Sequence, residues 1–262
     1  MPGQPGAVHL VGGGRDEAGV VTLLERFVQD AAAARGEALD APRIHALLVL
    51  EVDDNEGVER FGRALRLAGA DVALHSIEEG AAFDSTAVED ADGIFVGGGL
   101  TPAYHAAFAE IASLVRERVA AGMPYLGFSA GAAIAADRAL IGGYLVDGVA
   151  VCDEDAGEEL DEVTVVGGLG LVPFSVDVHA AQWGTVSRLI AAAGAGLVES
   201  GFAIDEHTAV QWRNGGSAAT VTVVGRGAAW HVTRVGNTAH GSVVVDRIVA
   251  QTTKPVPVGP AD

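Results

Sequence analysis

The chain has 262 residues, of which 49% are hydrophobic and 19% charged, so it can bury a substantial core. Its formal net charge of -19 gives a surface that repels nucleic acid and anionic membranes, and neither is an expected partner. The single cysteine, Cys152, excludes an internal disulfide and any metal site built from several cysteines.

The first residues, 1–6, lack the basic start and long apolar core of a secretory signal peptide. The sequence also contains no apolar run of about 18 residues, the length needed to span a bilayer. These features favour a cytoplasmic protein.

Short apolar runs alternate with helix-like segments through the first half of the chain. The alternation predicts βαβ units in a mostly parallel, doubly wound sheet with helices on both faces. Expected strands cover 7–11, 43–52, 71–77, 93–96 and 124–128, and expected helices cover 16–35, 57–68, 103–121 and 132–136.

The pattern changes after residue 136. A dense acidic stretch, 153–162, is followed by a candidate strand at 164–172 and a helix at 182–193. Three further runs separated by glycine turns predict antiparallel strands at 201–212, 218–224 and 228–235. Because no linker divides the chain, we expect one α/β domain over 1–262, with loose termini at 1–6 and 253–262.

The five residues Gly127-Phe128-Ser129-Ala130-Gly131 lie between an apolar run and a helix-like segment. Strand, Gly-x-Ser-x-Gly and helix is the arrangement of a nucleophile elbow. A serine at such a sharp turn presents its hydroxyl outside the sheet, and the N–H groups of the following helix face developing negative charge. The motif predicts that Ser129 is a nucleophile.

A serine hydroxyl needs a base to take its proton, and the base is usually a histidine held by a carboxylate. Among eight histidines, His179 is the best placed, because it follows an apolar run that ends where a helix begins. A residue there faces the carboxyl edge of a parallel sheet. His207, in an expected turn after Asp205-Glu206, is a weaker candidate.

Four motifs in order resemble the serine peptidase family of aspartyl dipeptidase (peptidase E) and cyanophycinase. They are the first glycine loop, Gly12–Gly14; the elbow together with the glycine loop upstream of it, Phe95–Gly99; a histidine segment, Asp177–Arg188; and a stretch similar to that family's "G-x-x-I-D-E-x-T-A" signature, Gly201–Ala209. The resemblance extends over roughly residues 8–250.

The resemblance implies a class I glutamine-amidotransferase-like fold and a serine hydrolase that cleaves a peptide or related acyl bond. It implies Ser129 as nucleophile, His179 as general base, and an oxyanion hole from the N–H of Ala130 and the loop holding Gly98 and Gly99. Glycine suits that loop because no Cβ obstructs the approach of a backbone N–H to the oxyanion. No metal or organic cofactor is needed.

Three aspartates are candidates for the acid that completes the triad. Asp147 lies at the offset from Ser129 that the cyanophycinase branch uses, so it is our choice. Asp153 and Asp177 remain alternatives. Asp147 is also explained as a turn residue, because Asp-Gly is a common turn pair.

Departures from the family pattern concern the substrate. Trp183 and Thr185 stand where cyanophycinase has arginines, and only Arg188 matches. Leu100 replaces the asparagine of the dipeptidase's glycine loop. We therefore expect Leu100, Trp183 and Arg188 to bind the substrate, in a more apolar pocket than either relative has. The partner is a small peptide or acyl compound, and a homodimer is left open.

Two alternatives share these residues. An esterase or transacylase would use the same triad in biosynthesis, and a non-catalytic scaffold would keep only the fold. The acidic stretch 153–162 is interpreted as a solvated loop in preference to a cation-binding site. Cys152 is interpreted as a small buried apolar residue, since the elbow carries serine.

Overall fold

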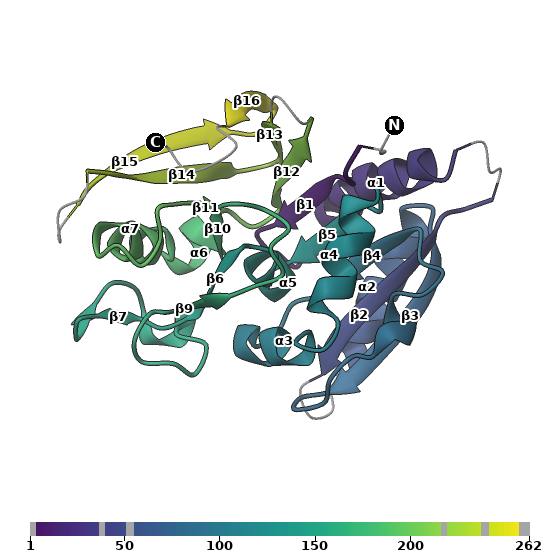
Figure 1. Cartoon of the computed structure of the whole chain (residues 1–262), viewed down its shortest axis with the longest axis horizontal. Helices are drawn as coiled ribbons and strands as arrows, with labels where there is room; N and C mark the ends of the chain where they lie inside the picture. The colour runs from purple at the N-terminus through teal and green to yellow at the C-terminus, as the bar shows by residue number, and fades with distance from the viewer. Residues whose placement is uncertain (1–3, 37–39, 51–54, 216–218, 237–240, 257–262) are drawn as a thin grey trace.

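The computed structural model describes residues 4–36, 40–50, 55–215, 219–236 and 241–256. Its largest sheet has eight strands in the order β16-β13-β12-β1-β5-β4-β2-β3 (Figure 1). Five of them pair in parallel and form the expected core: β1 (Val8–Val11), β5 (Tyr125–Phe128), β4 (Gly93–Val96), β2 (Arg43–Leu50) and β3 (Asp71–Glu78). The other three are antiparallel: β12 (Thr208–Asn214), β13 (Ala219–Gly225) and β16 (Thr252–Val256).

Helices cover both faces of this sheet, since the central strands β1, β4 and β5 are buried on both sides. One face packs against α1 (Glu17–Ala34) and α2 (Asn55–Leu67). The opposite face packs against α3 (Thr101–Ala107), α4 (Ala112–Ala120) and α5 (Ala130–Ile134). The mixed α/β class and the mostly parallel central sheet predicted from the sequence are confirmed.

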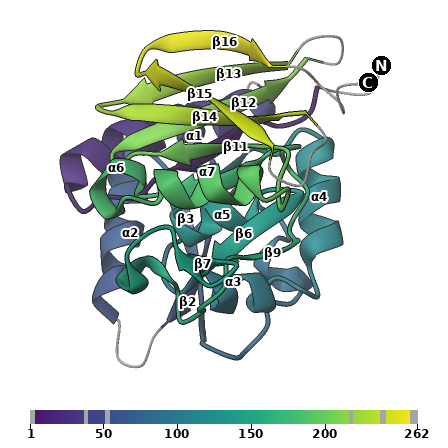
Figure 2. The same cartoon turned by 90° about the vertical axis from the view of Figure 1, so that its left-hand side faces the viewer.

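A second sheet of four strands stands beside the first. Its order is β10 (Ser175–Val178), β11 (Ser200–Ile204), β14 (Ala228–Val235) and β15 (Ser242–Val249), with β10 and β11 parallel. The short α6 (Ala180–Trp183) follows β10, and α7 (Val186–Gly194) packs against this sheet, as Figure 2 shows. The remaining short elements are η1 (Ser85–Ala87), β6 (Arg138–Gly142), β7 (Leu145–Val146), β8 (Val149–Ala150), η2 (Glu154–Ala156) and β9 (Thr164–Gly167).

Several predicted boundaries were wrong for local reasons. The helix expected at 103–121 is divided into α3 and α4, and the strand expected at 201–212 is divided into β11 and β12. The helix expected at 182–193 begins earlier and breaks at Gly184, which has the left-handed φ of 71°. Residues 253–256, which we expected to be loose, belong to β16 and pair with β13; residues 1–3 and 257–262 lie outside the described part.

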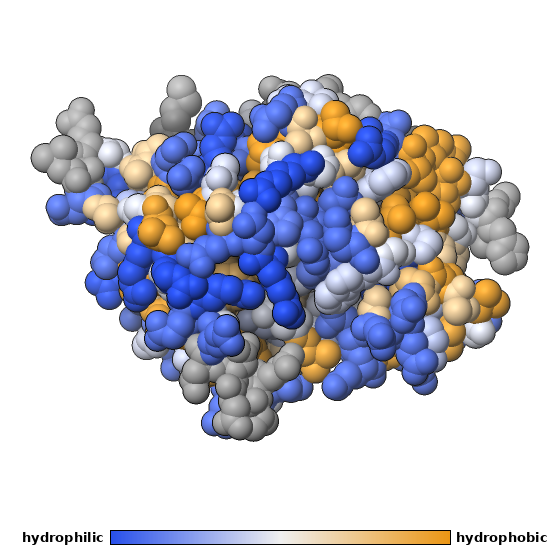
Figure 3. Space-filling model, turned by 180° about the vertical axis from the view of Figure 1, so that it is seen from behind, coloured by the Kyte–Doolittle hydropathy of each residue, from blue (hydrophilic) through white to orange (hydrophobic). Residues whose placement is uncertain are grey.

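The described surface is mostly hydrophilic on the face seen from behind (Figure 3). Figure 3 shows the face opposite to that of Figure 1, where hydrophilic residues predominate and apolar patches lie between them. Among the described residues, no helix combines the length and the apolar character needed to cross a bilayer.

Candidate active site

Ser129 occupies the turn between β5 and α5 with φ 52° and ψ -111°, a conformation that L-residues avoid. Such a residue typically costs about 1–3 kcal/mol. The flanking glycines make the turn possible. A Cβ on Gly127 would lie 2.2 Å from the Gly131 carbonyl oxygen, and one on Gly131 would lie 2.5 Å from the Val96 oxygen. The elbow predicted from Gly-x-Ser-x-Gly is thus present in the backbone.

Three side chains form a continuous chain of hydrogen bonds at this turn. Ser129 Oγ lies 2.8 Å from His179 Nε2. On the other edge of the ring, His179 Nδ1 lies 2.8 Å from Glu206 Oε1. With the carboxylate accepting from Nδ1–H, Nε2 is left as the acceptor for the serine proton. The arrangement can remove a proton from Ser129 and stabilise the resulting imidazolium.

The topology explains how residues far apart in sequence meet here. Strands β10 and β11 are parallel, with Val178 opposite Ile204, so their carboxyl ends lie at one edge. His179 follows the first strand directly, and Glu206 follows the second after one residue. On the neighbouring sheet, Val11 lies opposite Phe128, and Ser129 N donates to the Val11 oxygen at 2.9 Å.

The loop that carries Glu206 is held by its neighbours. Asp205 is buried, and its carboxylate accepts from the N–H groups of Ala181 and Ala228 and from the indole of Trp230. Thr208 Oγ1 donates to the backbone carbonyl oxygen of Glu206 and accepts from the backbone N–H of Gly227. The order Asp205-Glu206-His207-Thr208 therefore has a structural reason, because Asp205 and Thr208 fix the loop that presents Glu206.

The first glycine loop supports the histidine. Gly12 O accepts from His179 N at 2.9 Å, and Gly13 O accepts from His207 N at 2.9 Å. Gly13 has φ 103°, and a Cβ there would lie 2.1 Å from His179 Cε1. Gly12–Gly14 is therefore more than a tight turn, since only glycine allows the backbone to approach the imidazole so closely.

The second glycine loop lies against the serine. A Cβ on Gly98 would lie 2.8 Å from Ser129 Cβ, and Gly99 beside it is exposed. Ala130 is the first residue of α5, so its N–H has no acceptor within the helix. Ala130 and the loop of Gly98 and Gly99 therefore both lie next to Ser129.

Burial affects the histidine. His179 is 6% exposed, and desolvation lowers its pKa below the ordinary value, opposed by the hydrogen bond and charge of Glu206. A lowered pKa keeps the imidazole neutral, and able to accept a proton, at near-neutral pH.

The carboxylate on His179 corrects our prediction of Asp147. Asp147 lies exposed in the turn between β7 and β8 with φ 52°, consistent with its alternative interpretation as a turn residue. Asp153 is exposed and caps η2. Asp177 is buried and pairs with Arg188. The sequence analysis missed Glu206, although it stands inside the quoted motif.

The predicted substrate-binding residues lie in different environments. Arg188 is 4% exposed, and its guanidinium bonds both oxygens of Asp177, at 2.9 and 2.6 Å, and the oxygens of Gly143 and Ala156. It joins α7 to the loop after β6 and to η2, so the prediction that it binds substrate was wrong. Leu100 is half-buried at the start of α3, and Trp183 is exposed beside His179.

Part of the acidic stretch 153–162 is hydrogen-bonded to the rest of the protein. Arg188 fixes it through the Ala156 oxygen, and the half-buried Glu158 accepts from Thr101 N at 2.9 Å. Cys152 is half-buried, and desolvation raises the pKa of its thiol, which disfavours the nucleophilic thiolate. Among the described residues, no three histidine, cysteine, aspartate or glutamate side chains gather as a metal site would require.

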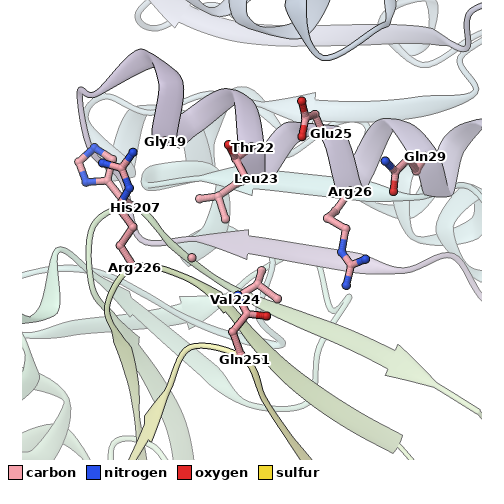
Figure 4. A pocket seen from close by; sticks show the side chains of 11 residues that line it. Gly19, Thr22, Leu23, Glu25, Arg26, Gln29, His207, Val224, Arg226 and Gln251 are labelled. Carbon is pink, nitrogen blue, oxygen red and sulfur yellow. The ribbon is translucent and has the colours of Figure 1, made fainter.

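A pocket of about 410 Å³ lies between α1 and β13, as Figure 4 shows. His207 stands on its border, and His207 Nε2 accepts from Asp16 N at 3.0 Å. Neither Ser129 nor His179 lines it. Thr22, Leu23, Arg26 and Val224 are among its lining residues.

A serine on a strand-to-helix turn, bonded to a histidine that a carboxylate holds, is the arrangement found in serine hydrolases. The chain belongs to peptidase family S51, whose family model matches residues 49–220. It is therefore a peptidase of the hydrolase class, and the family resemblance drawn from the four motifs is confirmed.

Solved structures agree with this assignment at the level of the fold. The crystal structure of a peptidase from an acI-B1 actinobacterium is 15% identical, with a TM-score of 0.69, over 98% of this chain and 99% of the other. A putative peptidase E protein from Listeria monocytogenes EGD-e is 18% identical, with a TM-score of 0.52, over 93% and 99%. No curated protein matches the chain.

Proposed function

We propose that the protein is a serine peptidase in which Ser129, His179 and Glu206 form the catalytic triad. The observation that carries the proposal is the pair of 2.8 Å contacts that link the serine hydroxyl to the imidazole and the imidazole to the carboxylate. Membership of a peptidase family supports the same assignment.

In the proposed reaction, Ser129 Oγ attacks the carbonyl carbon of the scissile bond while His179 Nε2 takes the hydroxyl proton. The carbonyl oxygen becomes an oxyanion beside the N–H of Ala130 and the loop of Gly98 and Gly99. When the C–N bond breaks, His179 returns the proton to the leaving amine. Water, activated by the same imidazole, then hydrolyses the acyl-enzyme. Loss of one oxyanion donor typically costs about 10²–10³ in kcat.

The substrate is proposed to be a small peptide with an apolar group near the reacting bond. Leu100 follows the glycine loop that lies against Ser129, and the exposed part of Trp183 lies beside His179, so both offer apolar surface to a substrate. Arg188 is occupied by Asp177 and is not free to bind an acidic group. A panel of short peptides that differ in the residue before the scissile bond tests this. Preference for acidic or doubly charged residues would contradict it.

The triad is tested by covalent labelling with a fluorophosphonate, which reacts with activated serines. We expect the wild-type protein to be labelled, Ser129→Ala to be unlabelled and His179→Ala to react far more slowly. Ser85→Ala is the matched control, because Ser85 lies in η1 and its hydroxyl donates to the Glu89 carboxylate. A folded wild-type protein that resists labelling would favour a non-catalytic protein.

A further inference from the structure

The indole of Trp183 lies face to face with the imidazole of His179. The ring centroids are 3.9 Å apart, and the planes differ by 8°. The two residues differ in exposure: Trp183 is 45% exposed, whereas His179 is 6% exposed. One face of the indole therefore covers the histidine while part of the side chain contacts solvent.

The local backbone produces this stack. Trp183 N donates to the His179 oxygen at 2.8 Å, which closes the single turn of α6. Residues four apart in such a turn lie one above the other. Gly184, with φ 71°, ends the turn immediately after the tryptophan, and Thr185 Oγ1 donates to the Val178 oxygen at 2.5 Å. The indole is thus held over the ring by a short structure that is anchored at both ends.

The other contacts of the imidazole are at its edges. Nε2 meets Ser129, Nδ1 meets Glu206, and the Cε1 edge faces the backbone of Gly13. Hydrogen bonds at two edges leave the ring free to tilt about the line that joins them. A flat aromatic surface at 3.9 Å opposes that tilt.

The requirement for this support changes during the reaction that we propose above, on which this inference rests. Once Ser129 is acylated, its oxygen belongs to an ester and carries no proton, so it no longer donates to Nε2. Glu206 and the Gly13 backbone at the edges of the ring, and the indole on its face, then hold the imidazole that must activate water. The imidazolium formed in each half-reaction also gains from the electron-rich indole face.

We propose that Trp183 is a positioning residue that fixes the plane of the His179 imidazole. It contributes to turnover without itself touching the reacting bond. Its replacement therefore lowers kcat, whereas loss of the apolar surface that its exposed part offers to the substrate would act on KM.

Two variants separate the aromatic stack from simple packing. Trp183→Phe keeps a ring at the same position, whereas Trp183→Leu keeps apolar volume without one. We expect kcat to fall about three- to tenfold in Trp183→Leu, the factor that corresponds to one aromatic pair, and to stay within about twofold in Trp183→Phe. Equal kcat in the wild type and both variants, or an effect confined to KM, would overturn the proposal.

The stack is also tested without any substrate. Protonation of an imidazole in contact with an indole quenches the indole fluorescence, so fluorescence should fall on acidification, with a midpoint at the pKa of His179. Glu206, Asp177 and Arg188 are the charged groups that act on this titration. The pH-dependent change should be absent in His179→Ala and in Trp183→Phe. A wild-type protein whose fluorescence is independent of this titration would refute the stack.

The two proposals fail in distinguishable ways. If fluorophosphonate does not label the protein, the triad is refuted, yet the fluorescence titration still reports whether Trp183 and His179 are in contact. If the protein is labelled and Trp183→Leu turns over at the wild-type rate, the triad stands and the positioning role is refuted.

Discussion

Replacement of Glu206 by glutamine is the sharpest test of the triad. The change keeps the size of the side chain and removes the negative charge that lies 2.8 Å from His179 Nδ1. The carboxylate is 22% exposed and the histidine side chain 8%, so the pair is only partly screened by solvent. For charge centres about 4 Å apart at an effective dielectric constant of about 20, the attraction is about 4 kcal/mol.

That energy stabilises the imidazolium, which exists in the transition state and not in the resting enzyme. Its loss therefore slows the reaction by about 10³-fold. The assay is the second-order rate of fluorophosphonate labelling, together with kcat/KM on an active peptide. Because the missing charge also lowers the pKa of His179 further, the acid limb of the pH profile should move to lower pH.

Asp147→Asn is the matched control, because it removes an exposed carboxylate from the turn that we first expected to complete the triad. It should label within about twofold of the wild type. The reasoning would be refuted if Glu206→Gln, shown to be folded by circular dichroism, reacted at the wild-type rate, or if the Asp147 variant lost the activity instead.

Three further predictions follow from the geometry. Because burial lowers the pKa of His179, kcat/KM should fall on acidification with a midpoint below about 6.5, measured as a pH-rate profile; a midpoint above 7 would contradict the assignment. Arg188→Met leaves Asp177 buried without its partner and should lower the free energy of unfolding by about 3–5 kcal/mol in urea titrations; unchanged stability with impaired substrate binding would restore the substrate role. Gly98→Ala places a methyl group 2.8 Å from Ser129 Cβ, so Ser129 or the loop must shift, and labelling should fall at least tenfold; labelling at the wild-type rate would show that the close approach of this loop to Ser129 is not needed for reactivity.

Much of the fold could be predicted because local sequence determines it. Strands buried on both faces are apolar, as in β4, β5 and, apart from His9, β1, and glycines mark the turns where they end. The elbow is equally local, since the steric demands at Ser129 are met by its immediate neighbours. The histidine was found for a related reason, as it stands at the carboxyl end of a strand.

The acid could not be predicted in the same way. Its position depends on the parallel pairing of β10 with β11, which brings Glu206 to a histidine 27 residues away. Counting residues from Ser129 to Asp147 carries no information about that pairing. Arg188 was misassigned for a similar reason, because its partner Asp177 lies 11 residues earlier on a neighbouring element, and only the packed structure shows that the charge is neutralised.

The strained backbone at Ser129 means that a substitution which removes the nucleophile can also increase the stability of the folded protein. The φ of 52° and ψ of -111° are tolerated by glycine far more readily than by any residue with a Cβ, so Ser129→Gly would abolish the hydroxyl and relieve the strain together. An inactive descendant of this protein could thus melt at a higher temperature than its active parent. Selection for thermal endurance alone would tend to erase the nucleophile, and only a continuing need for the reaction would retain it.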